Sequence, residues 1–470
     1  MNGYGIHNSL EVIMAKGSNP RNPLEKKIKE LSVPAAESTI IKQEYYDKFD
    51  CKRGLRDING KGVLVGLTEI SEIIAAKEDA DGNRIPVDGE LYYRGIPIED
   101  IVKGFVKEKR FGYEEVVYLL LFGKLPNAKE FDEFKGILSA LRKLPNGFLR
   151  DVIMKKSSPD MMNVLQRSVL TMYAYDENPD SIAIDNVLMQ CLDLIAKFPM
   201  LSVYGYQVFK HYHEDGDLII HQPEGEFSTA ENILRMLRDD GKFTPLEAKL
   251  LDLCLVLHAE HGGGNNSTFT AHVVTSSGTD TYSAIAASLG SLKGPRHGGA
   301  NAKVIKMMDD IAANVKSYSE KDIKDYLGQI LDGKVFDKQG LIYGMGHAIY
   351  SKSDPRAKIL KSFVKPLAIE KGMEKEYELY RKIEVLAPQV IAEKRKIYKG
   401  VSANIDFYSG FIYRLLGIPT ELFTPIFAIS RIAGWSAHRI EELSNAGKII
   451  RPAYDAVAPR AKYIKLSERK

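Results

Sequence analysis

The sequence predicts a mostly α-helical fold with a small β element near the N-terminus. Three observations lead to this prediction. Strand-like patterns are confined to residues 62–97, apolar residues recur at helical spacing from about residue 98 onward, and strands and helices do not alternate in a βαβ pattern. A chain of 470 residues is too long for one simple core, so we expect two domains.

The N-terminal part of the chain contains the strand signals. Residues 1–23 are expected to be irregular, and an amphipathic pattern predicts a short helix at 24–31. Two apolar runs, 63–65 and 91–93, are separated by the turn sequence Asp81-Gly82-Asn83. This arrangement predicts a small antiparallel β element.

Capping signals mark helix boundaries in the rest of the sequence. Thr244-Pro245-Leu246-Glu247 is a capping box with proline at the first helical position. Asp354-Pro355-Arg356 begins another helix with its aspartate as N-cap, and Thr424-Pro425 begins a long one that ends at Asn445-Ala446-Gly447. Two further helices are expected, at 300–310 and 407–416.

The composition is that of an ordinary globular protein, with 44% hydrophobic and 27% charged residues. A net charge of +3 predicts no nucleic-acid partner and no membrane-binding surface. The three cysteines are far apart and no Cys-x-x-Cys occurs, which favours a reducing compartment. There is no signal-like N-terminus and no run of 18 apolar residues, so we expect a cytoplasmic protein without a membrane span.

Two histidines stand three residues apart at the predicted end of the helix that begins after Thr244. His258 and His261, in His258-Ala-Glu-His261-Gly-Gly-Gly-Asn, would share one helix face. A metal site is one interpretation, although the His-Glu-x-x-His order of zinc proteases is absent. The simpler interpretation is capping by His261, because a histidine suits the negative end of a helix dipole.

Two more histidines are flanked by glycine, which leaves the imidazole and the backbone N–H open to a small ligand. His297, in Gly-Pro-Arg-His297-Gly-Gly-Ala-Asn, precedes the predicted helix at 300–310. The positive end of that helix disfavours imidazolium, so the ring is expected to stay neutral and donate to a developing enolate oxygen. A loop histidine in a tight turn fits the motif equally well. His347 lies in Gly-Met-Gly-His347-Ala-Ile-Tyr.

Three charged residues could meet a small anionic or acidic molecule. Arg356 falls in a first helical turn, where free N–H groups favour anions, or is a solvated surface charge. Asp406, in Asn-Ile-Asp406-Phe-Tyr-Ser-Gly, is a partly desolvated general base or an N-cap. Arg431 shares a helix face with Phe427 and needs a partner, which is an anionic ligand or a structural carboxylate.

Together these segments resemble the citrate synthase family. The three histidines next to glycine and the aspartate follow one another at intervals of 36, 50 and 59 residues, and Arg431 and Arg451 follow after a further 25 and 20. The Gly-Pro-x-His-Gly-Gly-Ala-Asn and Gly-x-Gly-His…Asp-Pro-Arg segments are highly specific when found together. The similarity covers about residues 58–460 and leaves the first 55 or so unassigned.

The resemblance implies a role for each residue. His297 would be the acid partner at the acetyl-CoA thioester carbonyl, Asp406 would remove the methyl proton, and His347 would polarise the ketone of oxaloacetate. Oxaloacetate would be held by His261, Arg356, Phe427, Arg431 and Arg451. CoA would lie along Leu341, Ile342, Tyr343, Gly344, Gly346, Lys352, Lys399 and Asn404.

The resemblance also implies a reaction and an architecture. Acid and base act together on the acetyl group, the enol attacks oxaloacetate, and hydrolysis of citryl-CoA releases citrate and CoA at the entry to the tricarboxylic acid cycle. No metal and no permanently bound cofactor is expected. A large helical domain, 58–297 and 411–470, would be interrupted by a small helical domain, 298–410, after an extension, 1–57. Arg451 would reach into a second subunit, which implies a homodimer.

Three other functions fit part of the pattern. A 2-methylcitrate synthase, which accepts propionyl-CoA, would use the same catalytic residues. A helical regulator that binds CoA or a dicarboxylate would release no thiol, and it would not need Asp406 as a base. A metal-dependent hydrolase would lose its activity with a chelator.

Overall fold

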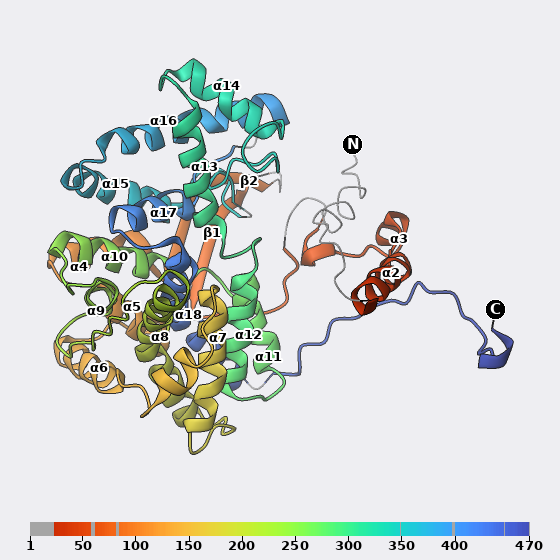
Figure 1. Ribbon diagram of the computed structural model, residues 1–470, viewed down its shortest axis with the longest axis horizontal. Coiled ribbons are helices and arrows are strands. Elements are labelled where there is room, and N and C mark those ends of the chain that lie inside the picture. Colours follow the sequence, from red (N-terminus) through yellow and green to blue (C-terminus); the bar gives the residue numbers. More distant parts are fainter. Residues whose placement is uncertain are drawn as a thin grey trace. The chain divides into compact units, whose positions relative to one another are not determined.

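The computed structural model describes residues 23–57, 62–80, 84–347, 349–396, 400–445 and 447–469. The chain forms two compact units. The first comprises Met1–Gly66 and Arg451–Lys470, and the second is Leu67–Ile450. The second unit contains the β element and the helices from Ile98 onward (Figure 1).

Helices make up most of the second unit, which confirms the predicted fold class. They are α4 (Ile98–Lys107), α5 (Tyr113–Phe122), α6 (Ala128–Leu141), α7 (Met161–Met172), α8 (Ile184–His213), α9 (Thr229–Leu237), α10 (Pro245–His258), α11 (Asn266–Thr275), α12 (Thr281–Lys293), α13 (Ala300–Asn314), α14 (Glu320–Leu331), α15 (Pro355–Glu370), α16 (Glu374–Arg395), α17 (Ile405–Leu415) and α18 (Phe423–Ser444). Single turns of other helix types are η2 (Leu149–Met154), η3 (Tyr173–Tyr175) and η4 (Thr420–Leu422).

Among its described residues, the first unit has two helices, α2 (Pro23–Glu37) and α3 (Gln43–Lys48), and the turns η1 (Arg53–Leu55) and η5 (Leu466–Glu468). Helix α2 confirms the helix predicted at 24–31 and is longer than predicted. Neither α2 nor α3 has a buried residue. The prediction that 1–23 is irregular falls almost wholly outside the described residues.

The β element is an antiparallel sheet of β1 (Ser71–Glu78), β2 (Arg84–Tyr93) and β3 (Ile96–Pro97). Pairing of Ile73 with Leu91 confirms the antiparallel arrangement and the strand at 91–93. The strand predicted at 63–65 is wrong, because these residues are exposed and lie in an irregular segment outside the sheet. Three apolar residues between two glycines give no alternating pattern with one face to bury. The predicted turn at 81–83 lies outside the described residues.

Most of the predicted helix starts are confirmed. Thr244 Oγ1 accepts from the N–H of Glu247, whose carboxylate accepts in return from the N–H of Thr244 at 2.7 Å. Asp354 caps α15 by accepting from the N–H of Arg356 at 3.0 Å. Helix α18 begins at Phe423, one residue before the predicted start, and its C-cap is Asn445.

The helices of the second unit form two groups (Figure 1). In one, α14 packs on α16, and α17 packs on both α13 and α15. In the other, the buried helix α18 packs against α5, α7, α8, α10, α11 and α12. Helix α10 touches α15 and α17 and so joins the two groups. The predicted domain limits at 298 and 410 stay a prediction.

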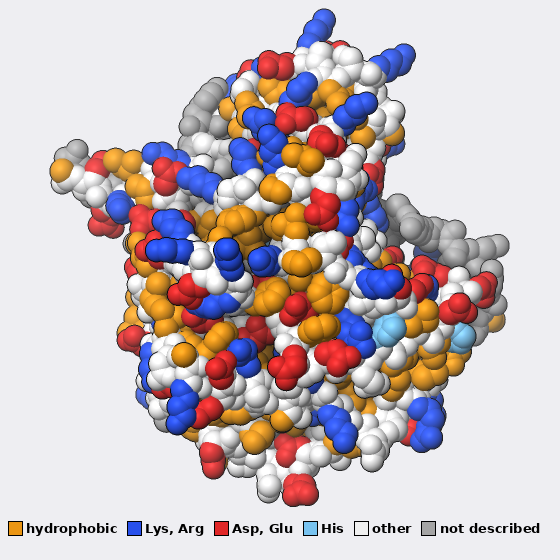
Figure 2. Space-filling view, turned by 90° about the vertical axis from the view of Figure 1, so that its left-hand side faces the viewer, with side chains coloured by type: hydrophobic (Ala, Val, Ile, Leu, Met, Phe, Trp, Pro, Cys, Tyr) orange, Lys and Arg blue, Asp and Glu red, His pale blue; other side chains and the backbone are white. Residues whose placement is uncertain are grey.

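Two surface properties bear on the expected partners. Of the described helices, α8 alone has the length and apolar composition of a membrane span, and 83% of its most apolar window is buried within the protein. Burial in the core explains its composition. On the face shown in Figure 2, acidic and basic side chains are interspersed, in keeping with the small net charge of +3.

Candidate active site

The predicted site residues of the second unit lie where the end of α10, the loop before α15, the start of α17 and the middle of α18 meet. Helix α10 contacts α15, α17 and α18, and α15 contacts α17. The four helices are drawn side by side in Figure 1. This arrangement brings together segments that are more than 100 residues apart in the sequence.

His261 lies beyond the end of α10, in the loop that follows. The helix ends at His258 with Ala259 as C-cap, so the predicted capping by His261 is wrong. Gly262 turns the chain with φ +83°, and its N–H donates to Glu260. His261 is buried, and its ring centre lies 5.2 Å from that of His347. Burial and the nearby Arg356 hold the pKa of His261 well below its usual value, so the ring is neutral.

The loop that carries His347 is tied to the segment before α17. The N–H of Gly346 donates to Ser402 O at 2.8 Å, and Nδ2 of Asn404 donates to Gly346 O at 2.8 Å. Met345 and Ala403 form an isolated antiparallel bridge. His347 therefore lies just after Met345 on one side of this bridge, and α17 begins just after Ala403 on the other.

The backbone fixes the tautomer of His347. Its Nδ1 accepts from the N–H of Ile349 at 3.0 Å and from the N–H of Tyr350 at 3.3 Å. An accepting Nδ1 carries no proton in the neutral ring, so the proton resides on Nε2. His347 is therefore a hydrogen-bond donor through Nε2–H.

Asp406 lies in the first turn of α17. The N-cap of this helix is Asn404, whose Oδ1 accepts from the N–H of Asp406 at 3.0 Å. The interpretation of Asp406 as the N-cap is therefore wrong. Desolvation raises the pKa of Asp406 to about 6, although Arg356 and Arg431 pull it down. The carboxylate is ionised at neutral pH and more basic than an ordinary aspartate.

His297 lies between α12 and α13 and contacts Ser267, a residue that the sequence did not indicate. Its Nε2 lies 3.0 Å from Ser267 Oγ, and Nε1 of Trp435 donates to the same oxygen at 3.2 Å. Burial, followed by the charge of Arg431, lowers the pKa of His297 to about 4. The ring is neutral as expected, but burial is the main cause and not the helix dipole.

Arg356 is buried and makes two hydrogen bonds to Asp354. Nε donates to Oδ1 at 3.0 Å and Nη2 to Oδ2 at 2.8 Å. The interpretation of Arg356 as a solvated surface charge is therefore wrong. Asp354 also accepts from the N–H of Ile405, the first residue of α17. This ion pair joins the starts of α15 and α17 beside Asp406.

Arg431, on α18, is fully buried and only partly satisfied. Its Nε donates to His258 O at 2.7 Å, and its guanidinium lies 4.7 Å from the ring centre of Phe427. Within the described part of the chain, Nη1 and Nη2 have no hydrogen-bond partner, and neither has Nε2 of His261. Burial lowers the pKa of Arg431 to about 10, so it remains a cation at neutral pH.

The remaining predicted residues include several exposed side chains and two glycines with positive φ. Arg451 is exposed and belongs to the first unit. Lys399 lies outside the described residues, and Leu341 and Lys352 are exposed. The glycines at 344 and 346 adopt φ of +78° and +88°, which explains glycine there without a ligand. Of the other predicted CoA residues, Ile342 is buried and the Tyr343 hydroxyl donates to Asp337 at 2.6 Å.

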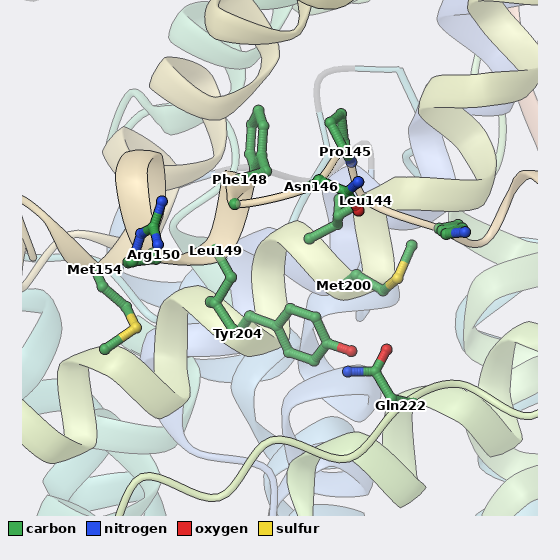
Figure 3. A pocket seen from close by; sticks show the side chains of 12 residues that line it. Leu144, Pro145, Asn146, Phe148, Leu149, Arg150, Met154, Met200, Tyr204 and Gln222 are labelled. Atoms are coloured by element: carbon green, nitrogen blue, oxygen red, sulfur yellow. The ribbon is translucent and has the colours of Figure 1, made fainter.

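A cavity of about 350 Å³ lies elsewhere, beside α8. Its lining is mainly apolar and includes Phe148, Leu149, Met154, Met200 and Tyr204 (Figure 3). None of the predicted site residues lines it. The cavity contains no combination of acid, base and open cation like that found around Asp406 and Arg431.

Comparison with known proteins identifies the family. Residues 55–453 match the model for the C-terminal domain of citrate synthase. The chain is 37% identical to a citrate synthase of Synechocystis sp. over 81% of this chain and 89% of the relative. It is 32% identical to 2-methylcitrate synthase 1 of Corynebacterium glutamicum over 87% and 97%.

A solved structure shows the same fold. The ternary complex of citrate synthase from Thermoplasma acidophilum with carboxymethyl coenzyme A and oxaloacetate superposes with a TM-score of 0.73. It is 27% identical and covers 89% of this chain and 99% of its own. The chain therefore belongs to the citrate synthase family and is an enzyme of that type.

Proposed function

We propose that this enzyme condenses acetyl-CoA with oxaloacetate and hydrolyses citryl-CoA to citrate and CoA. The observation that carries the proposal is the open guanidinium of Arg431, a fully buried cation whose Nη1 and Nη2 have no protein partner among the described residues. Leaving such donors unsatisfied is costly unless an anion fills the site. The bidentate geometry of a guanidinium suits a carboxylate. Oxaloacetate has two carboxylates.

The other groups suit the remaining atoms of oxaloacetate. His261 offers a buried Nε2 without a protein partner in the described region, and Arg356 adds a second buried cation. His347 donates through Nε2 to the ketone oxygen, since its Nδ1 is occupied by backbone N–H groups. This hydrogen bond makes the ketone carbon more electrophilic.

The acetyl group is activated by an acid and a base. Asp406, with a pKa of about 6, removes a methyl proton from acetyl-CoA. His297 stays neutral, and when Ser267 donates to its Nε2 the ring proton resides on Nδ1. That N–H stabilises the enol oxygen, and the enol carbon then attacks the ketone of oxaloacetate. Water hydrolyses the citryl thioester and releases CoA.

We extend the proposal to CoA, assembly and location. CoA lies along the backbone of 341–346, with Asn404, Lys352 and Lys399 beside it. Two copies form a homodimer in which Arg451 of one subunit completes the oxaloacetate site of the other. The enzyme acts in the cytoplasm at the entry to the tricarboxylic acid cycle and needs no metal for this reaction. Support for the CoA contacts, the dimer and the metal-free reaction comes from the family resemblance, and support for the location comes from the three scattered cysteines.

The second candidate is 2-methylcitrate synthesis from propionyl-CoA. It is favoured by the relative in Corynebacterium glutamicum, which is 32% identical over 97% of that protein's length. One methylene in a pocket contributes about 1–3 kcal/mol, or roughly 10- to 200-fold in kcat/KM. The two activities are therefore to be separated by kinetics.

The test is CoA release, followed with a thiol reagent, with acetyl-CoA or propionyl-CoA and with or without oxaloacetate. We expect release only with oxaloacetate and a kcat/KM at least about tenfold higher for acetyl-CoA. A preference for propionyl-CoA would select the second candidate. Binding without release indicates a regulator, and release without oxaloacetate indicates a thioester hydrolase. Either result overturns the proposal.

A further inference from the structure

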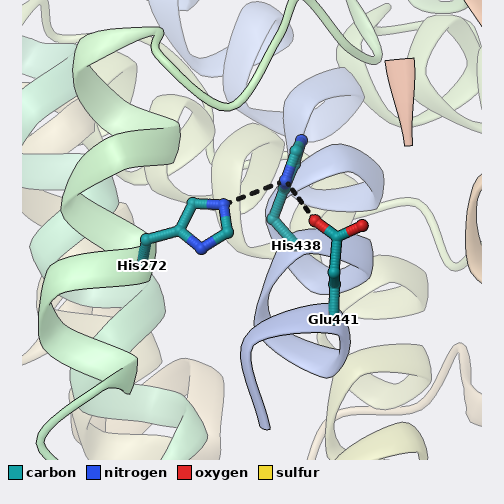
Figure 4. A group of neighbouring side chains, drawn as sticks. All are labelled: His272, His438 and Glu441. Atoms are coloured by element: carbon teal, nitrogen blue, oxygen red, sulfur yellow. Dashed lines mark hydrogen bonds and ion pairs between the residues drawn. The ribbon is translucent and has the colours of Figure 1, made fainter. Parts of the chain in front are cut away.

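A second cluster of titratable side chains lies between α11 and α18. His272 comes from α11, and His438 and Glu441 come from α18 (Figure 4). One ligand atom from each residue lies within 4.8 Å of those of the other two. The two histidines are 166 residues apart in the sequence, so no short motif revealed them. None of the three is among the residues assigned to oxaloacetate or CoA.

The inner atoms of the cluster have the spacing of metal ligands. Nε2 of His272 lies 3.1 Å from Nδ1 of His438, and this Nδ1 lies 3.5 Å from Oε2 of Glu441. Two ligand atoms about 2.0–2.1 Å from a tetrahedral zinc ion are separated by roughly 3.3 Å. These two pairs need to move by only a few tenths of an ångström to hold such an ion, and the third pair, Nε2 of His272 and Oε2 of Glu441, lies within 4.8 Å.

The outer nitrogen of each ring is held by a carboxylate. Nδ1 of His272 lies 2.7 Å from Oε2 of Glu442, and Nε2 of His438 lies 3.1 Å from Oε1 of Glu260. Histidines that bind metals usually donate their second N–H to a carboxylate or carbonyl, which fixes the ring and increases its basicity. Each ring can therefore keep a proton on its outer nitrogen, and the inner nitrogens become available to a metal once the one proton between them is lost.

The third ligand atom is buried and incompletely satisfied. Oε2 of Glu441 makes the 3.5 Å ion-pair contact with Nδ1 of His438 but no closer hydrogen bond in the described region, whereas Oε1 accepts from the N–H of Glu69 at 2.7 Å. Gly263 lies beside both rings, because a Cβ there would be 3.5 Å from Cε1 of His438 and 3.6 Å from Nε2 of His272. The side chains of His272 and Glu441 are 13% and 11% exposed, so the cluster borders the solvent.

We propose that His272, His438 and Glu441 bind a zinc ion that ties α11 to α18. Two imidazoles and one carboxylate supply three ligands, and water completes a tetrahedron. Binding displaces the proton shared by the two facing ring nitrogens, and that proton is released to solvent. The alternative is a cluster that only shares this proton. The proposal does not depend on the reaction assigned to the active site.

The test uses the full-length protein without a histidine tag and with Cys51, an exposed thiol, replaced by serine. After stripping with a chelator, the protein is titrated with ZnCl₂ and with CoCl₂. We expect one equivalent of zinc per chain after dialysis and the intense visible bands of tetrahedral Co²⁺. His272→Ala and Glu441→Gln should weaken binding at least tenfold. His211→Ala, at an exposed histidine outside the cluster, should leave it unchanged.

Glu442→Gln keeps all three ligands and changes only the carboxylate behind His272. It should weaken zinc binding roughly 10- to 100-fold, as outer partners of metal-bound histidines do. Absence of stoichiometric zinc in the otherwise unchanged chain overturns the proposal, as does equal affinity in the His272→Ala and His211→Ala variants. Neither result affects CoA release, so this proposal and the proposed reaction fail separately.

Discussion

Helix α18 carries two buried arginines, eight residues apart, whose surroundings differ. Arg439 donates to Oγ1 of Thr281 and Oγ1 of Thr275 at 3.1 Å and to Thr279 O at 2.8 Å. Arg431 uses only Nε, and both of its terminal nitrogens lack a partner in the described residues. Both residues are fully buried. The described part of the protein thus satisfies all three donor groups of one buried cation and leaves both terminal nitrogens of the other open.

The difference shows how to separate structural from functional charge. Burial alone does not distinguish these arginines, because each is as inaccessible as the other. The distinction comes from counting donors and acceptors, since a buried polar group normally has a partner. Arg356 resembles Arg439 in this respect, as Asp354 holds it with two hydrogen bonds.

The largest effect is expected at the carboxylate beside the open arginine. Asp406→Asn preserves size but removes the base, so kcat for CoA release should fall roughly 10²- to 10⁴-fold. Oxaloacetate should still bind to Arg431, and its dissociation constant should change by only a few-fold. Steady-state kinetics and calorimetric titration measure the two quantities. Unchanged kcat would remove Asp406 from the mechanism.

The second prediction tests the two arginines directly. Arg431→Leu should weaken oxaloacetate binding by about 2–5 kcal/mol, since it removes the charge that meets a carboxylate. Its ligand-free stability should stay equal or rise, because a buried cation with open donors is lost. Arg439→Leu is the matched control on the same helix. It loses three hydrogen bonds from a charged donor, at about 1.5–3 kcal/mol each.

We therefore expect opposite results from the pair. Arg439→Leu should lower Tm strongly, and the fraction that folds should bind oxaloacetate normally. Calorimetry of binding and thermal unfolding of the same samples give both values. The comparison breaks down if Arg431→Leu lowers Tm as much as Arg439→Leu and leaves oxaloacetate affinity intact.

The third prediction concerns pH. Asp406 acts as a base only when ionised, and its pKa of about 6 implies that kcat/KM falls about tenfold per pH unit below pH 6. Protonation of Asp406 below pH 6 does not destabilise the folded state. Its pKa is raised above 3.8, so folding favours the protonated form and stability increases as pH falls through 6.

Asp354 behaves in the opposite way. Although burial alone would raise its pKa, Arg356 lowers it below 3.8, so the stability from this ion pair persists until pH falls below that value. Activity should therefore decline between pH 7 and 5. The contribution of Asp406 and Asp354 to stability, followed as Tm, should not decline in this range. A flat profile of kcat/KM down to pH 5 would contradict the role of Asp406.

The sequence predicted the parts of this site that are local. Glycine next to His297 and His347, the capping box at Thr244 and the N-cap at Asp354 all depend on residues within a few positions of each other. Two local interpretations failed because a neighbouring residue forms the cap. Asn404, and not Asp406, caps α17, and α10 ends with Ala259 as its C-cap, before His261. At both helix ends several neighbouring residues are able to act as the cap, and their spacing in the sequence does not identify which one does.

Contacts between distant segments could not be predicted in this way. Ser267 meets Trp435 across 168 residues, and the open nitrogens of Arg431 are visible only when every neighbour is known. The same holds for His272 and His438. One signal was available, because Trp435 follows Arg431 by four residues and so shares its helix face.

The smallest predicted effect concerns Trp435, one turn from each arginine of the comparison. Its indole N–H donates to Ser267, which contacts His297. Trp435→Phe removes this hydrogen bond, worth about 0.5–1.5 kcal/mol, and should lower kcat a few-fold through the orientation of His297. In a Ser267→Ala background the same substitution should no longer affect kcat, because the shared partner is gone. Additive losses in kcat would show that Trp435 acts only through packing.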